Sequence, residues 1–310
     1  MTYDKKTLNN GLRVITVSVP TSLSTTVLVL VEAGSKYETK EINGLSHFLE
    51  HMCFKGTLKR PTAFHIAAQL DSLGAEYNAF TGREYTGYFA KAENRHLETA
   101  LDVVSDLYLN PVFRPEEIEK ERGVIIEEIN MYEDLPMRKV EELFISLLYG
   151  DQPAGWDIAG TKEVIRKLNQ EEFVNYRNRH YLAQSTVVVV AGNLAKDSLA
   201  QKIEDCFSGI KVGPKDGKVK ILESQTGPQL LLRTKKSDQT HIILGARAYD
   251  TFNPKKYALQ VLADILGGGM SSRLFQSVRE KLGAAYYIKA QPDIYTDHGY
   301  LGVSAGIDHH

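Results

Sequence analysis

The sequence predicts an α+β protein built from a duplicated unit. Strand-like runs alternate with longer helical patterns along the chain. The stretch from Ser208 to Pro228, "SGIKVGPKDGKVKILESQTGP", is rich in glycine, lysine and proline and lacks helical periodicity, which is typical of a connection between domains. The order strand, helix, helix, strand follows this stretch, and residues 26–92 show the same order before it. We therefore expect two related α+β units joined by a linker.

In the first unit, apolar residues alternate in short runs that predict strands and recur every three or four residues in longer runs that predict helices. Pro115 suits the first turn of a helix, because the N–H that it lacks would be unpaired there anyway. The predicted elements are, in order, strands Leu12–Val17 and Thr26–Glu32, helices Gly44–Phe54 and Pro61–Leu73, strands Glu76–Phe80 and Thr86–Ala92, helices Asn94–Leu109, Pro115–Tyr132 and Arg138–Gly150, and strand Ser185–Leu194.

The second unit repeats these patterns over a shorter length. Its predicted elements are strands Gln229–Thr234 and Thr240–Arg247, helices Pro254–Leu266 and Ser272–Leu282, and strands Ala285–Pro292 and Gly299–Gly306. We expect an N-terminal domain over residues 1–210, a linker over residues 211–228 and a C-terminal domain over residues 229–310.

The composition excludes several classes of protein. The chain has 310 residues, 43% hydrophobic and 25% charged, which is typical of a globular protein. Its net charge of −2 gives no general reason to expect a nucleic acid as partner. No apolar run is long enough for a membrane span, and the N-terminus resembles neither a signal peptide nor a transit peptide, so we expect a cytoplasmic protein. Cys53 and Cys206 lack metal or redox spacing, so we interpret them as small buried residues or inert thiols.

The stretch "GLSHFLEHMCFKGT", from Gly44 to Thr57, places His47, Glu50 and His51 among apolar residues. A single histidine on an apolar helix face is more often a hydrogen-bonded core residue, and the pattern H-x-x-E-H also arises by chance. On a helix, however, His47 and His51 project from one face and can share a metal, with Glu50 beside them. This is the zinc motif H-E-x-x-H in inverted order.

A catalytic zinc needs a third protein ligand, which must come from elsewhere in the chain. The helical stretch "PEEIEKERGVIIEEINMYED" offers several glutamates, any of which could lie on a solvated face. At about 100° per residue, one broad apolar arc contains Ile118, Val124, Ile125, Ile126, Ile129, Met131 and Tyr132.

Helical phase separates the glutamates of this stretch. Glu127 falls opposite the centre of the apolar arc, whereas Glu121 and Glu128 fall inside it. A carboxylate within an apolar stripe must be paired, protonated or bound to a metal, because an isolated buried carboxylate is costly. We predict Glu128 as the zinc ligand and Glu121 as a carboxylate that supports the metal site from two turns earlier.

Four separated stretches resemble the pitrilysin/insulinase metallopeptidases, and most closely the branch of mitochondrial and bacterial processing peptidases. They are "GLSHFLEHMCFKGT", "YNAFTGREYTGYFA", "ERGVIIEEINMYEDLP" and "GGGMSSRLFQSVREKLGAAYYI", in the order of the family, with its 77-residue step from His51 to Glu128. The resemblance implies duplicated α/β-roll domains, each a mixed, largely antiparallel sheet packed with helices. It also implies one Zn²⁺ per chain, bound by His47, His51 and Glu128, with Glu50 as the general base.

The resemblance implies further site residues. Asn78 and Ala79, with Phe80 beside them, would lie on an edge strand that pairs with the backbone of the substrate. Arg279 and Tyr286 match a pair in the second domain that reaches the substrate across a chamber. The glycine run at residues 267–269 matches a glycine-rich loop of the family, and a phosphate-binding loop is disfavoured because no Lys-Ser/Thr follows it.

Members of this branch usually continue well beyond the position of His310. The second domain therefore looks incomplete, and we expect a second copy of the chain or a related partner subunit to cover its exposed sheet.

The resemblance predicts a zinc-dependent endopeptidase that hydrolyses peptide bonds of unfolded or short polypeptides, bound as an added strand. Two other interpretations stay open. One is a non-catalytic or scaffold subunit of a heteromeric processing peptidase, although such a subunit needs neither a base nor three metal ligands. The other is a structural metal site, although such sites are typically four-ligand and cysteine-rich, and Cys53 has no partner cysteine nearby.

Overall fold

The computed structural model describes residues 3–194 and 196–309, and the chain folds into two compact units. The first unit comprises Met1–Glu127 and Asp157–Lys218, and the second comprises Glu128–Trp156 and Val219–His310. None of the helices in the described chain combines the length and the apolar composition that crossing a lipid bilayer requires.

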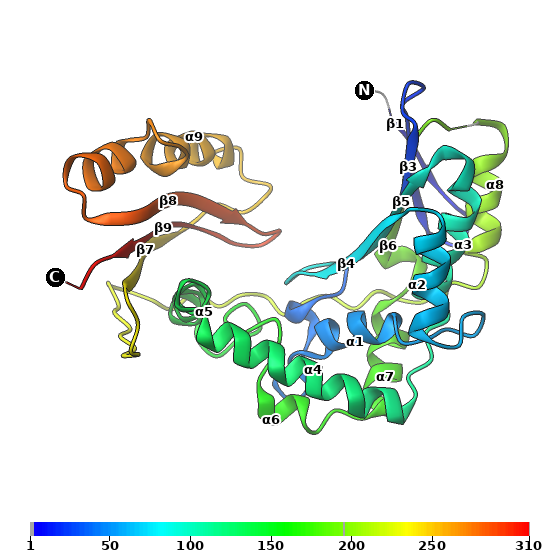
Figure 1. Cartoon of the computed structure of the whole chain (residues 1–310), viewed down its shortest axis with the longest axis horizontal. Coiled ribbons are helices and arrows are strands. Elements are labelled where there is room, and N and C mark those ends of the chain that lie inside the picture. The colour runs from blue at the N-terminus through cyan, green and yellow to red at the C-terminus, as the bar shows by residue number, and fades with distance from the viewer. Residues whose placement is uncertain (1–2, 195, 310) are drawn as a thin grey trace. The chain divides into compact units, whose positions relative to one another are not determined.

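A six-stranded sheet forms the core of the first unit, with strand order β1-β2-β6-β3-β5-β4 (Figure 1). Only the pairing of β2 with β6 is parallel, and the other neighbours are antiparallel. The sheet is therefore mixed and largely antiparallel, as expected. Its strands are β1 (Tyr3–Thr7), β2 (Arg13–Ser18), β3 (Ser24–Val31), β4 (Glu76–Thr81), β5 (Thr86–Glu93) and β6 (Thr186–Gly192).

Helices cover this sheet because its strands alternate in burial. Along β3 every second residue is buried, and Val27, Val29 and Val31 are completely buried. Helix α3 packs on β3 and β5, and α1 packs beside β4. The helices of this unit are α1 (Leu45–Cys53), α2 (Ala63–Ser72), α3 (Leu97–Leu109), α6 (Lys162–Ile165), α7 (Gln170–His180) and α8 (Lys196–Cys206), together with the larger part of α4 (Pro115–Asp134).

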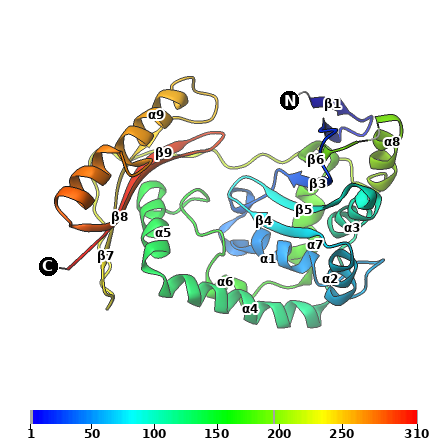
Figure 2. The ribbon, with the colours of Figure 1, turned by 45° about the horizontal axis from the view of Figure 1, so that its top comes forward.

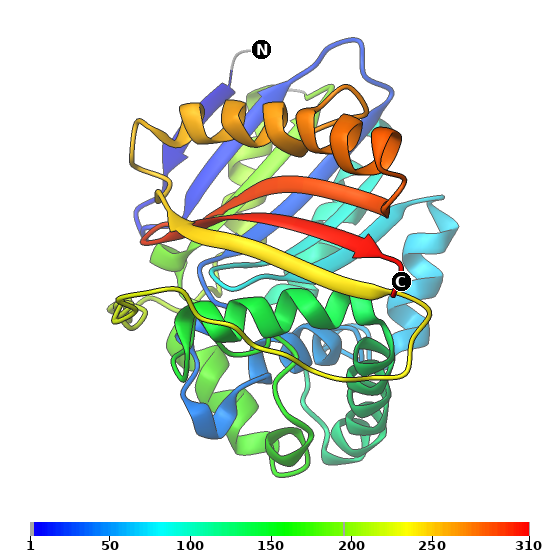
Figure 3. The same cartoon turned by 90° about the vertical axis from the view of Figure 1, so that its left-hand side faces the viewer.

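The second unit has a three-stranded antiparallel sheet of order β7-β9-β8. Figure 3 shows the three strands side by side, with β9 in red between β7 in yellow and β8 in orange. The elements of this unit are α5 (Pro136–Tyr149), β7 (Thr240–Ala248), α9 (Lys256–Gly267), the π-helical segment η5 (Phe275–Lys281), β8 (Ala285–Ile294) and β9 (Gly299–Ile307).

Helices α5 and α9 lie on opposite faces of the three-stranded sheet (Figure 2). A Cβ atom on Gly245 of β7 would lie 2.5 Å from the ring of Phe144 on α5, whereas one on Gly302 of β9 would be in ordinary contact with that ring at 3.9 Å. The next residue of β9, Val303, turns to the other face, where it packs with Phe275 and Ile288. Glycine at position 245 of β7 thus lets the aromatic ring of α5 lie close to the backbone of the sheet.

The predicted duplication is confirmed by the topology of the two sheets. In the first unit, strand β3 is followed by two helices and the β4–β5 hairpin. In the sheet, β5 lies between β3 and β4. In the second unit, β7 is followed by α9, η5 and the β8–β9 hairpin, with β9 again in the middle. The orders β3-β5-β4 and β7-β9-β8 are therefore equivalent.

The segment that follows the predicted linker differs from the sequence prediction. The strand predicted at Gln229–Thr234 is wrong, because residues 209–238 form neither helix nor strand, and Leu230 and Leu232 are 78% and 82% exposed. An apolar run forms a strand only beside a partner edge, and ion pairs from Arg233 and Lys235 hold this run to the end of α4 instead.

The compact units also differ from the predicted domain bounds. Helix α5, predicted within the N-terminal domain, packs on β7, so residues 128–156 belong to the second unit. The physical reason is the apolar face of α5, since Leu148 and Tyr149 form a buried cluster with Tyr300 of β9. The division into functional domains over residues 1–210 and 229–310 stays a prediction.

Candidate metal centre

Helix α1 carries the inverted motif on the one face that stays partly accessible. Leu45, Phe48, Leu49 and Met52 are completely buried, whereas His47, Glu50 and His51 keep intermediate exposure. The apolar residues anchor the helix, and the three polar residues share its remaining face, as a helical repeat requires.

The start of α1 is held by a buried carboxylate. Gly44 precedes the helix with a φ of 100°, a conformation that favours glycine. Glu38 is 2% exposed and accepts hydrogen bonds from the backbone N–H groups of Gly44 at 2.8 Å and Ser46 at 2.6 Å, from the hydroxyl of Ser46, and from the side chain of Asn43 at 3.0 Å. Burial raises the pKa of Glu38, and these hydrogen bonds partly offset the rise. The carboxylate thus satisfies N–H groups that a helix start leaves unpaired.

Two histidines and a glutamate bring their metal-binding atoms together. The rings of His47 and His51 lie 4.7 Å apart between centroids. One ligand atom from each of His47, His51 and Glu128 lies within 4.8 Å of the other two. Glu128 is carried by α4, a continuous helix whose residues 115–127 belong to the first unit. Its carboxylate also accepts a hydrogen bond of 2.7 Å from the hydroxyl of Tyr132.

These three residues fit a zinc ion by donor type and spacing. Tetrahedral zinc with bonds of about 2.0–2.1 Å holds its ligand atoms about 3.4 Å apart, so a small adjustment of side chains closes the observed spacing. Two imidazoles and one carboxylate are also the donor set of several catalytic zinc sites, which keep a fourth position open. The alternative of a cysteine-rich structural site gains no support, because Cys53 is completely buried and burial raises the pKa of its thiol to about 12.

Glu121 contacts His51 through one nitrogen of the imidazole ring, Nδ1. Its carboxylate lies 2.9 Å from Nδ1 of His51 and 2.5 Å from Nζ of Lys55. Burial raises the pKa of Glu121, but the hydrogen bonds from His51 and Lys55 outweigh it, so the pKa of this carboxyl lies below its usual range. A carboxylate that accepts a hydrogen bond from Nδ1–H leaves Nε2 of His51 to face a metal.

The helical phase predicted for α4 holds for the glutamates but not for every apolar residue. Glu121 is 4% exposed and Glu127 is exposed, as predicted. Val124 and Met131 were predicted inside the buried arc but are 50% and 49% exposed, so that part of the prediction is wrong. Burial along α4 is confined to a narrow line through Ile118, Glu121 and Ile125.

Glu50 contacts the end of a neighbouring strand. The hydroxyl of Thr81, the last residue of β4, donates a hydrogen bond to Oε2 of Glu50. β4 lies at the edge of the six-stranded sheet, where it pairs with β5, and α1 runs beside it (Figure 1). The predicted substrate-binding residues Asn78, Ala79 and Phe80 all lie on β4, with Asn78 and Phe80 exposed and Ala79 partly buried.

Arg279 and Tyr286 lie next to each other in the second unit. The guanidinium of Arg279, on η5, lies 5.9 Å from the centre of the Tyr286 ring at the start of β8. Arg279 is exposed, and the side chain of Tyr286 is 72% exposed. The two residues thus form a contacting pair on one surface, and their approach to the metal centre stays a prediction.

Three contributors to the site were missed from the sequence, namely Glu38, Lys55 and Thr81. Lys55 lies four residues after His51, so its projection from the same side of the motif could have indicated a partner for a nearby carboxylate. Glu38 and Thr81 act across chain separations of 8 and 31 residues, through loop and strand geometry that helical periodicity does not encode.

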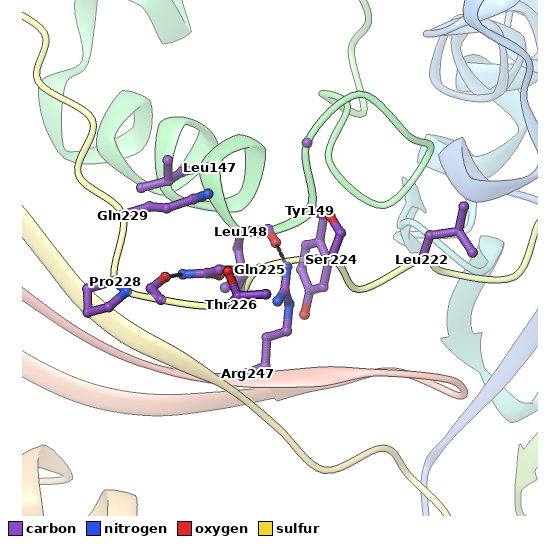
Figure 4. Close-up of a pocket in the computed structure, with 12 residues that line it drawn as sticks. Leu147, Leu148, Tyr149, Leu222, Ser224, Gln225, Thr226, Pro228, Gln229 and Arg247 are labelled. Carbon is purple, nitrogen blue, oxygen red and sulfur yellow. Dashed lines mark hydrogen bonds between the residues drawn. The ribbon is translucent and has the colours of Figure 1, made fainter.

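A cavity of about 400 Å³ in the second unit is lined by other residues (Figure 4). Its wall includes Leu148, Tyr149, Leu222 and residues 224–229, with Arg247 opposite. Arg247 donates a hydrogen bond to the backbone carbonyl of Leu148 and lies 5.8 Å from the centre of the Tyr149 ring. Arg247, the charged side chain of the wall, thus joins β7 to α5 through these contacts.

Comparisons with known proteins cover almost the whole chain. Residues 13–162 match the family described as Insulinase (Peptidase family M16), and residues 167–310 match the Peptidase M16 inactive domain. The uncharacterized zinc protease YmxG of Bacillus subtilis is 39% identical over 300 residues, which are 97% of this chain and 72% of that protein. An uncharacterized zinc protease of Rickettsia felis is 39% identical over 303 residues, which are 97% of this chain and 73% of that protein.

Solved structures share the fold at lower identity. A protease from Helicobacter pylori has a TM-score of 0.91 at 22% identity, over 99% of this chain and 75% of that chain. A peptidase M16 inactive domain from Pseudomonas fluorescens has a TM-score of 0.90 at 18% identity, over the same shares of the two chains. The fold, the identity to the zinc proteases and the two matched domains lead to one conclusion. The chain belongs to the insulinase family of peptidases, peptidase family M16.

Proposed function

We propose that the chain is a zinc-dependent endopeptidase that hydrolyses peptide bonds of unfolded or short polypeptides. The observation that carries the proposal is the convergence of His47, His51 and Glu128, whose ligand atoms lie within 4.8 Å of one another beside Glu50. A structural metal site has no need of a carboxylate on the same accessible helix face.

In this proposal His47, His51 and Glu128 hold one zinc ion per chain. When bound, zinc would supply a Lewis acid that polarises a peptide carbonyl and makes water more acidic. Glu121 would keep the ring of His51 in one orientation by accepting a hydrogen bond from its Nδ1–H, with Lys55 holding the other carboxylate oxygen.

Glu50 would act as the general base. Its carboxylate lies on the same partly accessible face of α1 as the two histidines, one residue before His51. In the reaction it would take a proton from the attacking water and later pass that proton to the leaving amine.

The edge strand β4 would bind the substrate as an added strand. An edge strand presents backbone N–H and C=O groups that an extended peptide can pair with, whatever its sequence. β4 ends at Thr81, which contacts Glu50, so a peptide paired along Asn78–Phe80 would run toward the base. Only unfolded or short polypeptides supply such an extended segment.

The second unit would contribute Arg279 and Tyr286. Both side chains are exposed and adjacent, so they can present a guanidinium and a hydroxyl to the same bound molecule. Donors of this kind stabilise negative charge that develops on a carbonyl oxygen or bind the substrate backbone.

A second copy of the chain or a related subunit would serve as partner of this protein. Sedimentation across a dilution series tests this association.

A non-catalytic subunit is the second candidate function. The match of residues 167–310 to a domain described as inactive favours it. That match lies outside His47, Glu50, His51 and Glu128, and these four residues favour the active enzyme.

Peptide cleavage by the zinc-loaded protein tests the proposal. The protein is stripped with a chelator, reloaded with zinc and incubated with an unstructured peptide, and the fragments are identified by mass. We expect internal cleavage that disappears in the stripped sample and returns with zinc. Bound zinc without cleavage, across a set of unstructured peptides, would favour the non-catalytic subunit.

A further inference from the structure

The strand that is proposed to bind substrate also touches the proposed base. The Thr81 hydroxyl donates its hydrogen bond to Oε2 of Glu50 from the last position of β4. Exposure alternates along β4, so Tyr77, Ala79 and Thr81 share its less exposed face, and Asn78 and Phe80 share the other. Thr81 therefore lies on the same strand face as Ala79, with its hydroxyl against α1.

The turn that follows Thr81 is fixed to the protein on several sides. Gly82 donates from its backbone N–H to the carbonyl of Tyr85 at 2.8 Å, which closes the hairpin. The backbone N–H of Lys36 donates to the carbonyl of Arg83 at 2.9 Å. A Cβ atom on Gly34 would lie 2.4 Å from the carbonyl oxygen of Gly82, so this loop and the turn pack backbone against backbone.

A buried ion pair adds to this attachment. Nζ of Lys36 lies 2.9 Å from Oε1 of Glu84, and the two side chains are 1% and 10% exposed. Lys218 pairs with the same oxygen of Glu84, so residues from two distant parts of the chain hold this turn. The Thr81 hydroxyl thus projects from a backbone that has little freedom to shift.

We propose that Thr81 is a positioning residue for Glu50. This inference rests on the proposed function. A general base works when its oxygen is held at hydrogen-bond reach of the proton it takes, and a carboxylate on a flexible side chain rotates unless something holds it. Thr81 holds one oxygen of Glu50 from a fixed strand end, which aims the other oxygen. The same residue ends the strand that pairs with the peptide, so it sets the base in register with the bound backbone.

Removal of the hydroxyl tests this role directly. Thr81→Val keeps the shape of the side chain and Thr81→Ser keeps the hydroxyl. We expect Thr81→Val to lower kcat about 10-fold or more, with KM and zinc content near those of the wild type, because a hydrogen bond to a charged group is lost. Thr81→Ser should restore most of kcat. Thr26→Val makes the same change on β3, which is separated from β4 by β5 in the sheet, and should leave kcat unchanged.

A double-mutant cycle with Glu50→Gln separates positioning from a general structural effect. If Thr81 acts through Glu50, Thr81→Val should lower the residual rate of the Glu50→Gln protein far less than it lowers the wild-type rate. Equal losses in both backgrounds would overturn the proposal. So would wild-type kcat in Thr81→Val while the wild type cleaves peptide, an outcome that leaves the proposed function standing.

A readout without activity covers the case in which the wild type cleaves no peptide. The same cycle is then measured by urea unfolding, with Thr81→Val, Glu50→Gln and the double variant. Destabilisations that are not additive would support the contact, and strictly additive ones would overturn it. The absence of any wild-type cleavage would count against the proposed function.

Discussion

The carboxylate of Glu121 lies 2.9 Å from Nδ1 of His51, and its other oxygen lies 2.5 Å from Nζ of Lys55. A glutamate on α4 is thereby joined to the histidine that ends the inverted motif on α1. The contact determines which nitrogen of His51 can face a metal, since a proton on Nδ1 leaves Nε2 as the donor.

Glu121→Gln should weaken zinc binding without removing a ligand. Loss of a carboxylate that supports a metal-binding histidine typically lowers affinity about 10–100-fold. Titration with zinc against a competing chelator measures the change. Glu116→Gln, at an exposed position of the same helix, is the matched control. Unchanged affinity in Glu121→Gln would show that the contact does not support the metal.

Glu128→Gln should lower zinc occupancy and peptide cleavage together, because it removes an anionic ligand. The neighbouring Glu127 is exposed on another side of the helix, so Glu127→Gln should be close to silent. Metal content of the two purified variants decides between them. Loss of zinc from the Glu127 variant with retention in the Glu128 variant would contradict the assignment.

Glu38→Ala should destabilise the protein by about 2 kcal/mol or more, because buried N–H groups at the start of α1 lose their acceptor. The midpoint of urea unfolding measures the loss. Glu41→Ala, which removes an exposed carboxylate nearby, should leave the midpoint unchanged. Equal midpoints for the two variants would argue against a capping role for Glu38.

Tyr286→Phe should reduce turnover while zinc stays bound, because the hydroxyl is proposed to contact the substrate and no metal ligand changes. Tyr257→Phe removes a hydroxyl from another exposed tyrosine, which lies on α9, and serves as control. The measurement is kcat together with metal content. Full activity of Tyr286→Phe would remove this tyrosine from the proposed mechanism.

Much of the candidate metal centre could be predicted from local periodicity. The spacing of His47, Glu50 and His51 and the helical phase of α4 depend only on rotation per residue, which a sequence encodes directly. The phase placed Glu121 in the buried line and Glu127 toward water, and both placements hold in the structure. The helical phase predicted more buried residues along α4 than the structure shows. Burial of Val124 depends on whether another element packs against that side of α4, which the helical phase does not determine.

Other parts depend on tertiary contacts that periodicity does not contain. Helix α7 was not predicted because it is polar along most of its length, with Phe173 and Tyr176 as its buried anchors and a capping box at Asn169. Strand β1 is exposed at every position, so it lacks the alternation that marks a half-buried strand. The contact between Thr81 and Glu50 joins a strand end to a helix, and no local pattern marks it.

The cleavage rate of zinc-loaded Glu50→Gln tests the central claim most directly. The substitution keeps His47, His51 and Glu128, so zinc content should equal that of the wild type. Without the base, the rate of peptide cleavage should fall by about 10²–10⁴-fold. Zinc content and fragment yield are measured on the same sample, with Glu127→Gln as control. A Glu50→Gln protein that retains zinc and cleaves the peptide near the wild-type rate would contradict the account.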